Sequence, residues 1–155
     1  MELPIQPLEV LVEESEATRL DLPPLLEQLY GGPFGLRERL VYANFVSMLD
    51  GVVAVPSLTQ SNKLISGGND ADRLVMGLLR AVADVILIGA GTLHGSPRGS
   101  WTPERAFAPS AGAFAELRRR LGLSAAPELA ILSGSGSLSP THPALESGAR
   151  PVPSP

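Results

Sequence analysis

The chain has 155 residues, a length typical of one domain, and 44% of them are hydrophobic while 18% are charged. That balance is typical of a globular protein and excludes an intrinsically disordered chain. The formal net charge of −4 provides no general attraction for nucleic acid or an anionic membrane, so we expect neither as a partner. Cysteine is absent, which excludes disulfides, thiolate metal sites and cysteine nucleophiles.

The first ten residues, MELPIQPLEV, lack a basic stretch followed by an apolar one, as a secretory signal would require. Nowhere do roughly 18 apolar residues follow one another, the length that a membrane span needs. We therefore expect a cytoplasmic protein. With only two histidines and no cysteine, we also expect no transition-metal site.

Residues 1–38 form an acidic arm marked by Leu and Pro, and its best element is a short helix over 23–30. Leu25, Leu26 and Leu29 share one face of that helix, and the glycines that follow it end it. The pattern predicts an arm that packs against the rest of the chain.

The next stretch, 40–48, mixes β-branched, aromatic and aliphatic residues and predicts a strand that is buried on at least one face. Asp50 and Gly51 then predict a turn into a second short strand over 52–55. Asn44 lies within the otherwise apolar first strand, so its amide should need a hydrogen-bonding partner.

A helix is expected to begin at Asn69, which can cap it, with Asp70 and Asp72 suited to the positive end of the helix dipole. Its apolar residues recur at helical spacing, so this helix should pack on a sheet. A buried strand over 84–88 follows it.

The pattern continues with a second helix over 111–121, in which three arginines lie near the C-terminal end, and with an apolar strand over 128–133. Two strands followed by helix, strand, helix and strand predict an α/β layer sandwich over 39–140. The tail, 141–155, is rich in Pro and Ser and is expected to be loop or disordered.

The run VILIGAGTL over 85–93 takes an apolar strand directly into glycines, as where backbone approaches a phosphate. A Rossmann fingerprint is excluded, because Gly89, Gly91 and Gly95 have the wrong spacing and Pro97 and Gly99 argue against a following helix. Two interpretations remain open: a ligand-binding strand end, or a tight turn without a ligand.

Three motifs occur in order: NFVSMLDG over 44–51, LLRAVADVILIG over 78–89 and GAGT over 89–92. Together they resemble the riboflavin-biosynthesis pyrimidine reductase family (the RibD C-terminal domain). The resemblance implies a dihydrofolate reductase-like three-layer sandwich with a central mixed sheet, of which 39–140 would be the N-terminal portion. It also implies an NADPH-dependent reductase that converts the ribosyl group of 5-amino-6-(5-phosphoribosylamino)uracil to ribityl.

The family's later glycine pair and its D-E-L-type strand do not occur in this sequence. The expectation is therefore either a truncated chain or a homodimer in which a second copy supplies the missing sheet edge.

The resemblance also assigns site residues. The cofactor would lie against the strand end, at Gly89, Ala90, Gly91 and Thr92. The phosphorylated pyrimidine would contact Asn44, Ser47, Asp50, Ser61, Ser66 and Arg98. Asp50 and Asp72 are the candidate catalytic acids.

Each assignment has a structural alternative. Asp50 can be part of a simple hairpin turn, Asp72 can serve the helix dipole, and Arg98 can be merely solvated. Two other functions also remain open: a non-catalytic nucleotide-binding or oligomerising remnant of the family, and a reductase of the same fold that acts on another substrate such as dihydrofolate.

Overall fold

The computed structural model of the chain describes residues 3–12, 16–53, 55, 62–96, 99–146 and 150–153. Its elements in chain order are β1 (Thr18–Leu20), α1 (Pro24–Tyr30), β2 (Phe34–Leu36), α2 (Asn62–Ser66), α3 (Asp70–Val82), β3 (Val85–Gly89), α4 (Ala90–His94), α5 (Pro103–Ala106), the 3-10 helix η1 (Ala108–Ser110), α6 (Ala111–Arg120), β4 (Glu128–Ser133), α7 (Pro143–Glu146) and β5 (Arg150–Pro153). The α/β class predicted from the sequence is confirmed. Among the described residues, no helix combines the length and apolar character that crossing a membrane requires.

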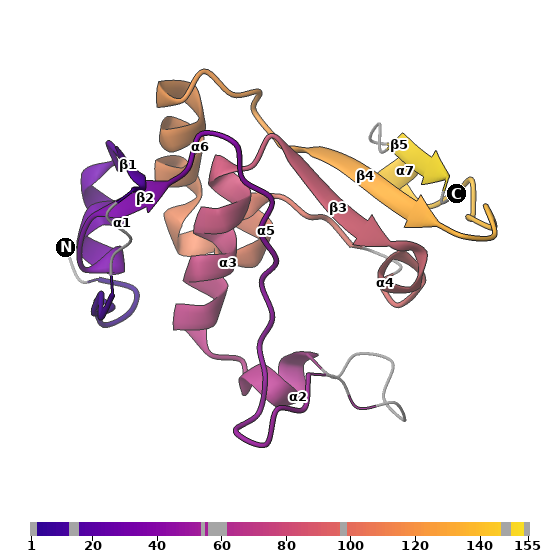
Figure 1. Cartoon of the computed structure of the whole chain (residues 1–155), viewed down its shortest axis with the longest axis horizontal. Coiled ribbons are helices and arrows are strands. Elements are labelled where there is room, and N and C mark those ends of the chain that lie inside the picture. Colours follow the sequence, from indigo (N-terminus) through magenta and orange to yellow (C-terminus); the bar gives the residue numbers. More distant parts are fainter. Residues whose placement is uncertain are drawn as a thin grey trace.

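Two parts of the molecule are easily distinguished in Figure 1. The helical half contains α1, α3, α5 and α6 together with the antiparallel pair β1–β2. The sheet half contains the parallel strands in the order β3–β4–β5, with α4 and α7. In the described residues the two sheets are separate, so the architecture is one small parallel sheet and one antiparallel pair.

The predicted N-terminal helix is confirmed as α1, which begins with Pro24 in its first turn. Gly31 ends the helix in the left-handed conformation, with φ of 77°, and its N–H donates to the Glu27 carbonyl at 3.0 Å. A Cβ at Gly31 would lie only 1.7 Å from the Leu8 carbonyl oxygen. The N-terminal segment thus packs directly over the end of α1.

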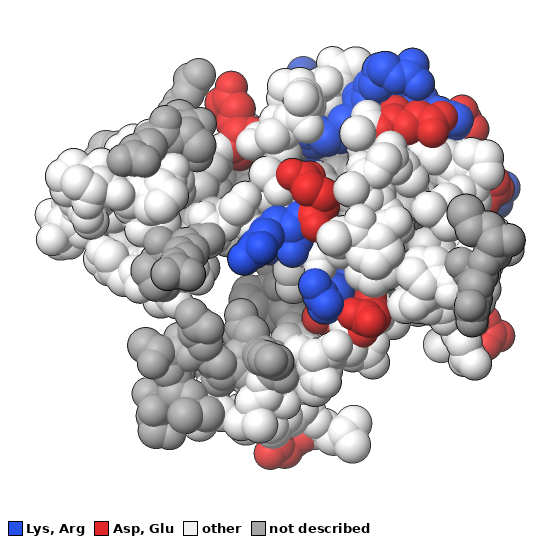
Figure 2. Space-filling view, turned by 180° about the vertical axis from the view of Figure 1, so that it is seen from behind, with Lys and Arg blue, Asp and Glu red and all other residues white. Residues whose placement is uncertain are grey.

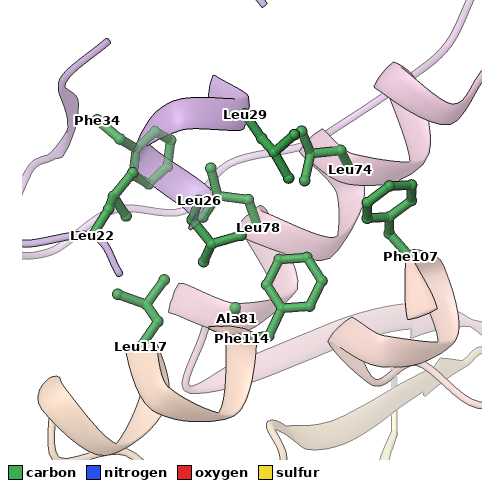
Figure 3. Close-up of a cluster of buried hydrophobic side chains, with 10 residues drawn as sticks. All are labelled: Leu22, Leu26, Leu29, Phe34, Leu74, Leu78, Ala81, Phe107, Phe114 and Leu117. Carbon is green, nitrogen blue, oxygen red and sulfur yellow. The ribbon is translucent and has the colours of Figure 1, made fainter. Parts of the chain in front are cut away.

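The predicted helix after Asn69 is confirmed as α3, and the Asn69 side-chain oxygen accepts from the Ala71 N–H at 2.8 Å. Its buried face belongs to one cluster, the helical core, shown in Figure 3. The buried members of the helical core are Leu22, Leu26, Leu29, Phe34, Leu74, Leu78, Ala81, Phe107, Phe114 and Leu117. The helix was expected to pack on a sheet: its cluster includes Phe34 of the β1–β2 pair together with α1 and α6, but among the described residues it includes none from the parallel strands.

Close contact between α3 and α6 depends on Gly77. A Cβ at this position would come within 2.6 Å of Cζ of the buried Phe114 ring and 3.2 Å of the Pro103 carbonyl oxygen. The absence of a side chain therefore lets the α6 aromatic ring lie directly on the α3 backbone.

The second predicted helix is confirmed as α6, and one of its three C-terminal arginines is almost wholly buried. Arg118 is 1% exposed, and its guanidinium donates to the carbonyl oxygens of Ala81 at 3.1 Å, Ala83 at 2.9 Å and Ser124 at 2.7 Å. The last turn of α3 leaves its carbonyls without helical partners. Arg118 satisfies them from a neighbouring helix.

In the sheet half, β3 pairs with β4 and β4 pairs with β5, both parallel. Ile88 lies opposite Ile131, so both point to the face that α4 and α7 cover. Leu93, Ile131 and Ala144 form the buried centre of this second cluster. The strand predicted over 84–88 is only half buried, because Leu87 on the opposite face is 62% exposed.

Three predictions of secondary structure are wrong. Residues 40–48 form no strand: this segment runs past α3 without a ladder partner, and the described part of 52–55 is also not in a strand. The 141–155 tail is not simply loop, because it contains α7 and the edge strand β5. Ala144, in α7, is buried in the cluster of the sheet half.

Candidate functional site

The glycine-containing strand end is formed by β3 and α4. Gly89 is the last residue of β3 and also the N-cap of α4, in an extended conformation with φ of −82° and ψ of 154°. A loop was expected to follow the strand, but residues Ala90–His94, which include Gly91 and Thr92, form the short helix α4. Because β3 and β4 are parallel, Gly89 and its partner Leu132 lie at the same end of the sheet, where the carboxyl ends of both strands meet.

The backbone conformation does not require glycine at position 89 or at position 91. Both lie outside the glycines with positive φ, and a Cβ on either would meet nothing within 4 Å. Both are exposed, as is Thr92, whereas Ala90 is half-buried. The sequence therefore keeps side chains away from an accessible main chain at the carboxyl end of a parallel strand, where α/β proteins commonly bind ligands.

The predicted substrate corner is a turn. The Gly51 N–H donates to the Met48 carbonyl at 2.9 Å, and the Met48 N–H donates to the Val52 carbonyl at 2.9 Å. An Asp50 carboxylate oxygen accepts from the Val52 N–H at 3.1 Å. The structural alternative for Asp50 is therefore present in the molecule, and Gly51 takes the positive φ of 85° that the turn requires.

Asn44 and Ser47 are exposed on the segment that leads to this turn. The expectation that Asn44 lies inside a strand and needs a buried partner is wrong, because this segment is irregular and open to water. In Figure 1 the segment runs past α3 toward the end of the molecule that holds α2, whereas α4 follows β3 on another side. Among the described residues, no hydrogen bond joins the Asp50 turn to the 89–92 strand end.

The other candidate residues lie at the end of α2, in the first turn of α3, or outside the described ranges. The Ser66 hydroxyl accepts from the Gly68 N–H at 3.2 Å, which is a local turn contact. Asp72 lies half-buried in the first turn of α3, as expected for a residue that serves the helix dipole. Ser61 and Arg98 lie outside the described residues.

Sequence reasoning gave no role to Arg80, in the last turn of α3. Its Nη1 donates to the Thr102 carbonyl at 3.4 Å, and burial lowers the pKa of the guanidinium below its ordinary value. Within the described ranges no carboxylate forms an ion pair with it. The available signal was its position, since an arginine interrupts the apolar residues of the LLRAVADV motif.

Two further observations limit the chemistry of the described residues. No group of three His, Asp or Glu side chains in the ranges that the structure describes is arranged to hold a metal ion. A pocket of about 130 Å³ lies on the N-terminal arm, with Val10, Tyr30 and Leu36 in its lining. This pocket is apart from the 89–92 strand end and from the Asp50 turn, since none of those residues lines it.

Charge is distributed unevenly over the surface. Figure 2 shows basic and acidic side chains interspersed over the helical half, while the sheet half is nearly free of charge on this side. The ion pairs in the helical half include Arg120 with Asp21 at 2.8 Å and Arg73 with Asp70 at 3.0 Å. An anionic ligand at the strand end would therefore depend on backbone N–H groups and hydroxyls more than on a basic patch.

No protein-family model matches the chain, and no curated protein matches it in sequence.

Proposed function

We propose that the chain is an NADPH-dependent reductase of the riboflavin-biosynthesis type, which acts on the ribosyl group of 5-amino-6-(5-phosphoribosylamino)uracil. The observation that carries the proposal is the exposed main chain at Gly89 and Gly91, where no feature of the fold requires glycine. The motifs over 44–51 and 78–92 support the same assignment. Under this proposal the parallel strands belong to a dihydrofolate reductase-like sandwich.

The strand end has the chemistry that a phosphate or a nicotinamide amide needs. An accessible backbone without side chains lets such a group come close, and the exposed Thr92 hydroxyl adds a donor. The coenzyme would supply a hydride to an electrophilic carbon of the opened ribosyl chain, and a proton would complete the reduction. The task of the protein is then to orient the two reactants.

One observation favours a second function, a nucleotide-binding protein without catalysis. Asp50 is engaged in its own turn, and its segment runs away from α4. If that arrangement persists when ligand is bound, the strand end can hold a coenzyme while no candidate acid reaches it. Reductase activity requires the 44–51 segment to approach the strand end.

The test is NADPH oxidation by the purified chain, followed by absorbance, with the aminouracil ribotide as substrate and dihydrofolate as the alternative. Oxidation with the ribotide alone supports the proposal, and oxidation with dihydrofolate alone assigns another substrate. NADPH binding in calorimetry without any oxidation supports the non-catalytic function. If neither binding nor oxidation is observed, the proposal is wrong.

A matched pair of glycines tests the strand end. Gly91 and Gly112 are the second residues of α4 and α6, and a Cβ at either would meet nothing within 4 Å. Each Gly→Ala substitution should therefore leave the fold intact and stabilise its helix by up to about 1 kcal/mol. We expect Gly91→Ala to raise the Kd for NADPH about tenfold, equivalent to about 1.4 kcal/mol, because the new methyl group obstructs the backbone. Gly112→Ala should leave this Kd unchanged.

A further inference from the structure

The pocket on the N-terminal arm lies where three stretches of the chain meet. Its lining comes from the N-terminal segment, from the residue before β1, and from the chain between the last residue of α1 and Leu40. Most of this lining is apolar and includes Val10, Val12, Pro33 and Leu36. Concave, mostly apolar pockets with a few polar groups are the usual form of a site for a small molecule.

Close contacts between the stretches hold the walls of the pocket in place. A Cβ at Gly35 of β2 would lie only 3.0 Å from the Ala17 Cβ. A Cβ at Gly32 would lie 3.0 Å from Cγ2 of Val10. The two glycines therefore let the N-terminal segment and the chain before β1 pack against the stretch after α1, and the pocket lies between these contacts.

One polar group of the pocket is the phenol of Tyr30, the last residue of α1. Its ring packs edge-on against Phe34, with 5.1 Å between the ring centroids. Burial raises the pKa of the Tyr30 hydroxyl above its ordinary value of 10.0, so this group keeps its proton at neutral pH. No other residue in the described ranges forms a hydrogen bond with the hydroxyl, which can therefore donate to a ligand.

The charge of the pocket comes from Arg37. Among the described residues that line the pocket, Arg37 is the only charged one. Its Nη2 lies 3.3 Å from Oε2 of Glu16, and both side chains of this ion pair are largely exposed. Exposed ion pairs contribute little free energy, so a ligand carboxylate can share or replace this contact. A guanidinium holds a carboxylate especially well, because it can donate two parallel hydrogen bonds.

We propose that this pocket binds a small aromatic carboxylate, with the ring between the apolar walls and the carboxylate on Arg37. The pocket has a volume of about 130 Å³. An apolar cavity of about 150 Å³ holds benzene, so a single six-membered ring is the size that fits. The positive charge of the lining selects an anionic substituent. The site is separate from the 89–92 strand end and does not depend on the function proposed there.

The first test is a titration of the nitrogen-15-labelled full chain with benzoate, followed by NMR. We expect one benzoate per chain, a Kd of about 1 mM or below, and shifts in the amide signals of Tyr30 and Leu36 but not of Gly91. Arg37→Gln should raise the Kd at least tenfold. Arg39→Gln is the matched control, because Arg39 is exposed and does not line the pocket.

Two further ligands separate the contributions of the ring and the charge. Benzyl alcohol has the ring without the charge and should bind at least fivefold more weakly than benzoate, whereas acetate has the charge without the ring and should cause no saturable shift. Equal binding of acetate and benzoate, no saturable shift with benzoate, shifts centred on the strand end, or equal losses in the two arginine variants would each overturn the proposal.

A second pair of variants tests the position of the ligand without removing a charge. Val12 and Leu11 are 87% and 84% exposed, but only Val12 lines the pocket. Val12→Trp should weaken benzoate binding at least fivefold, because the larger side chain obstructs the pocket, and Leu11→Trp should not. Circular dichroism checks that each variant is folded. Adding NADPH should leave the Kd for benzoate unchanged whether or not NADPH itself binds, so a failure of the reductase proposal would not affect this test, and competition by NADPH would contradict a separate site.

Discussion

The helical half and the sheet half of this protein bury their apolar side chains to very different extents. In the helical half, Leu74 and Leu78 of α3 meet Leu26 of α1 and Leu117 of α6, and all four are almost inaccessible to water. In the sheet half, one face is packed and the other leaves Leu87 62% exposed. Three amphipathic helices can cover one another, whereas a sheet needs a layer on each side. The sheet half therefore leaves one face of its strands open to water in the described residues, whereas the helices of the helical half cover one another.

The strongest test of this contrast is Leu78→Ala in the helical core. Leu78 is 1% exposed, so truncation removes buried methyl groups and leaves a cavity. We expect a loss of about 4 kcal/mol in the free energy of unfolding, measured by urea denaturation. A loss below about 1 kcal/mol would show that the helical core is not tightly packed.

Arg118→Met should destabilise the helical half by about 3 kcal/mol, because the carbonyls at the end of α3 lose a charged donor while remaining buried. Thermal unfolding provides the measurement. Arg119→Met is the control, since Arg119 is exposed on the same helix. Equal losses in the two variants would argue against the capping role of Arg118.

Gly77→Ala should cost about 2 kcal/mol, because the added methyl group must displace the Phe114 ring from the surface of α3. The helix-forming preference of Ala offsets part of this cost, by about 1 kcal/mol. The same urea titration is applied to Gly112→Ala, where no atom lies within 4 Å of the new Cβ and stability should rise. If Gly77→Ala is also stabilising, α3 and α6 are not in close contact.

Tyr42→Phe should cost about 1 kcal/mol at neutral pH, because the Tyr42 hydroxyl donates to the Leu79 carbonyl at 2.6 Å. Burial, and then the Asp84 charge, raise the pKa of Tyr42 in the folded chain above its ordinary value of 10.0. The folded state thus retains a proton that the unfolded state loses above about pH 10, and stability falls as pH rises through that range. The variant should lose less stability than the parent between neutral and strongly alkaline pH. Parallel slopes for the two proteins would exclude Tyr42 as a source of this pH dependence.

The smallest effect is expected on the face of the parallel sheet that α4 and α7 leave uncovered. Leu87→Ala should change the free energy of unfolding by less than about 0.5 kcal/mol at concentrations low enough to keep the chain monomeric, because Leu87 buries little surface. Comparison with Leu78→Ala isolates the contrast between the two halves, since both remove the same atoms. A loss similar to that of Leu78→Ala would mean that this face is already covered within a single copy.

Local patterns were sufficient to predict much of the fold. The Asn69 cap located the start of α3, and Gly31 and Gly122, both with positive φ, located the ends of α1 and α6. The apolar runs also identified β3 and β4. The helix ends depend on interactions between residues close in sequence, and the two strands were recognised from their apolar composition. Both kinds of signal can be read from the sequence itself.

The incorrect predictions concern partners that are distant in sequence. The 40–48 stretch has strand propensity, but propensity does not provide a ladder partner. The prolines of β5 suggested a loop, yet in a parallel edge strand only every second residue bonds to the neighbour. Arg150 and Val152 can donate to β4, while Pro151 and Pro153 face the open side, where no N–H is needed.

The candidate site was predictable only in part. The position of Gly89 and Gly91 at a strand end followed from the sequence, whereas the short helix α4 did not. The burial of Arg118 also had no local signal, because three consecutive arginines look alike until the fold brings one of them to the end of α3. Proximity between the Asp50 turn and the strand end is a question of tertiary structure that motif spacing does not answer.

The Arg118 contacts have a mechanical consequence. The polypeptide crosses from the helices into the sheet just after Ala83 and again after Ser124, and this one guanidinium binds the carbonyls of both residues. Near the same place the Glu128 N–H donates to the Asp84 carbonyl at 2.9 Å, which ties the two crossings together. Arg118 therefore links the two crossings, and this link should restrict the angle between the parallel sheet and the helices. Replacing it should broaden the distribution of molecular dimensions in small-angle scattering even where the secondary structure survives.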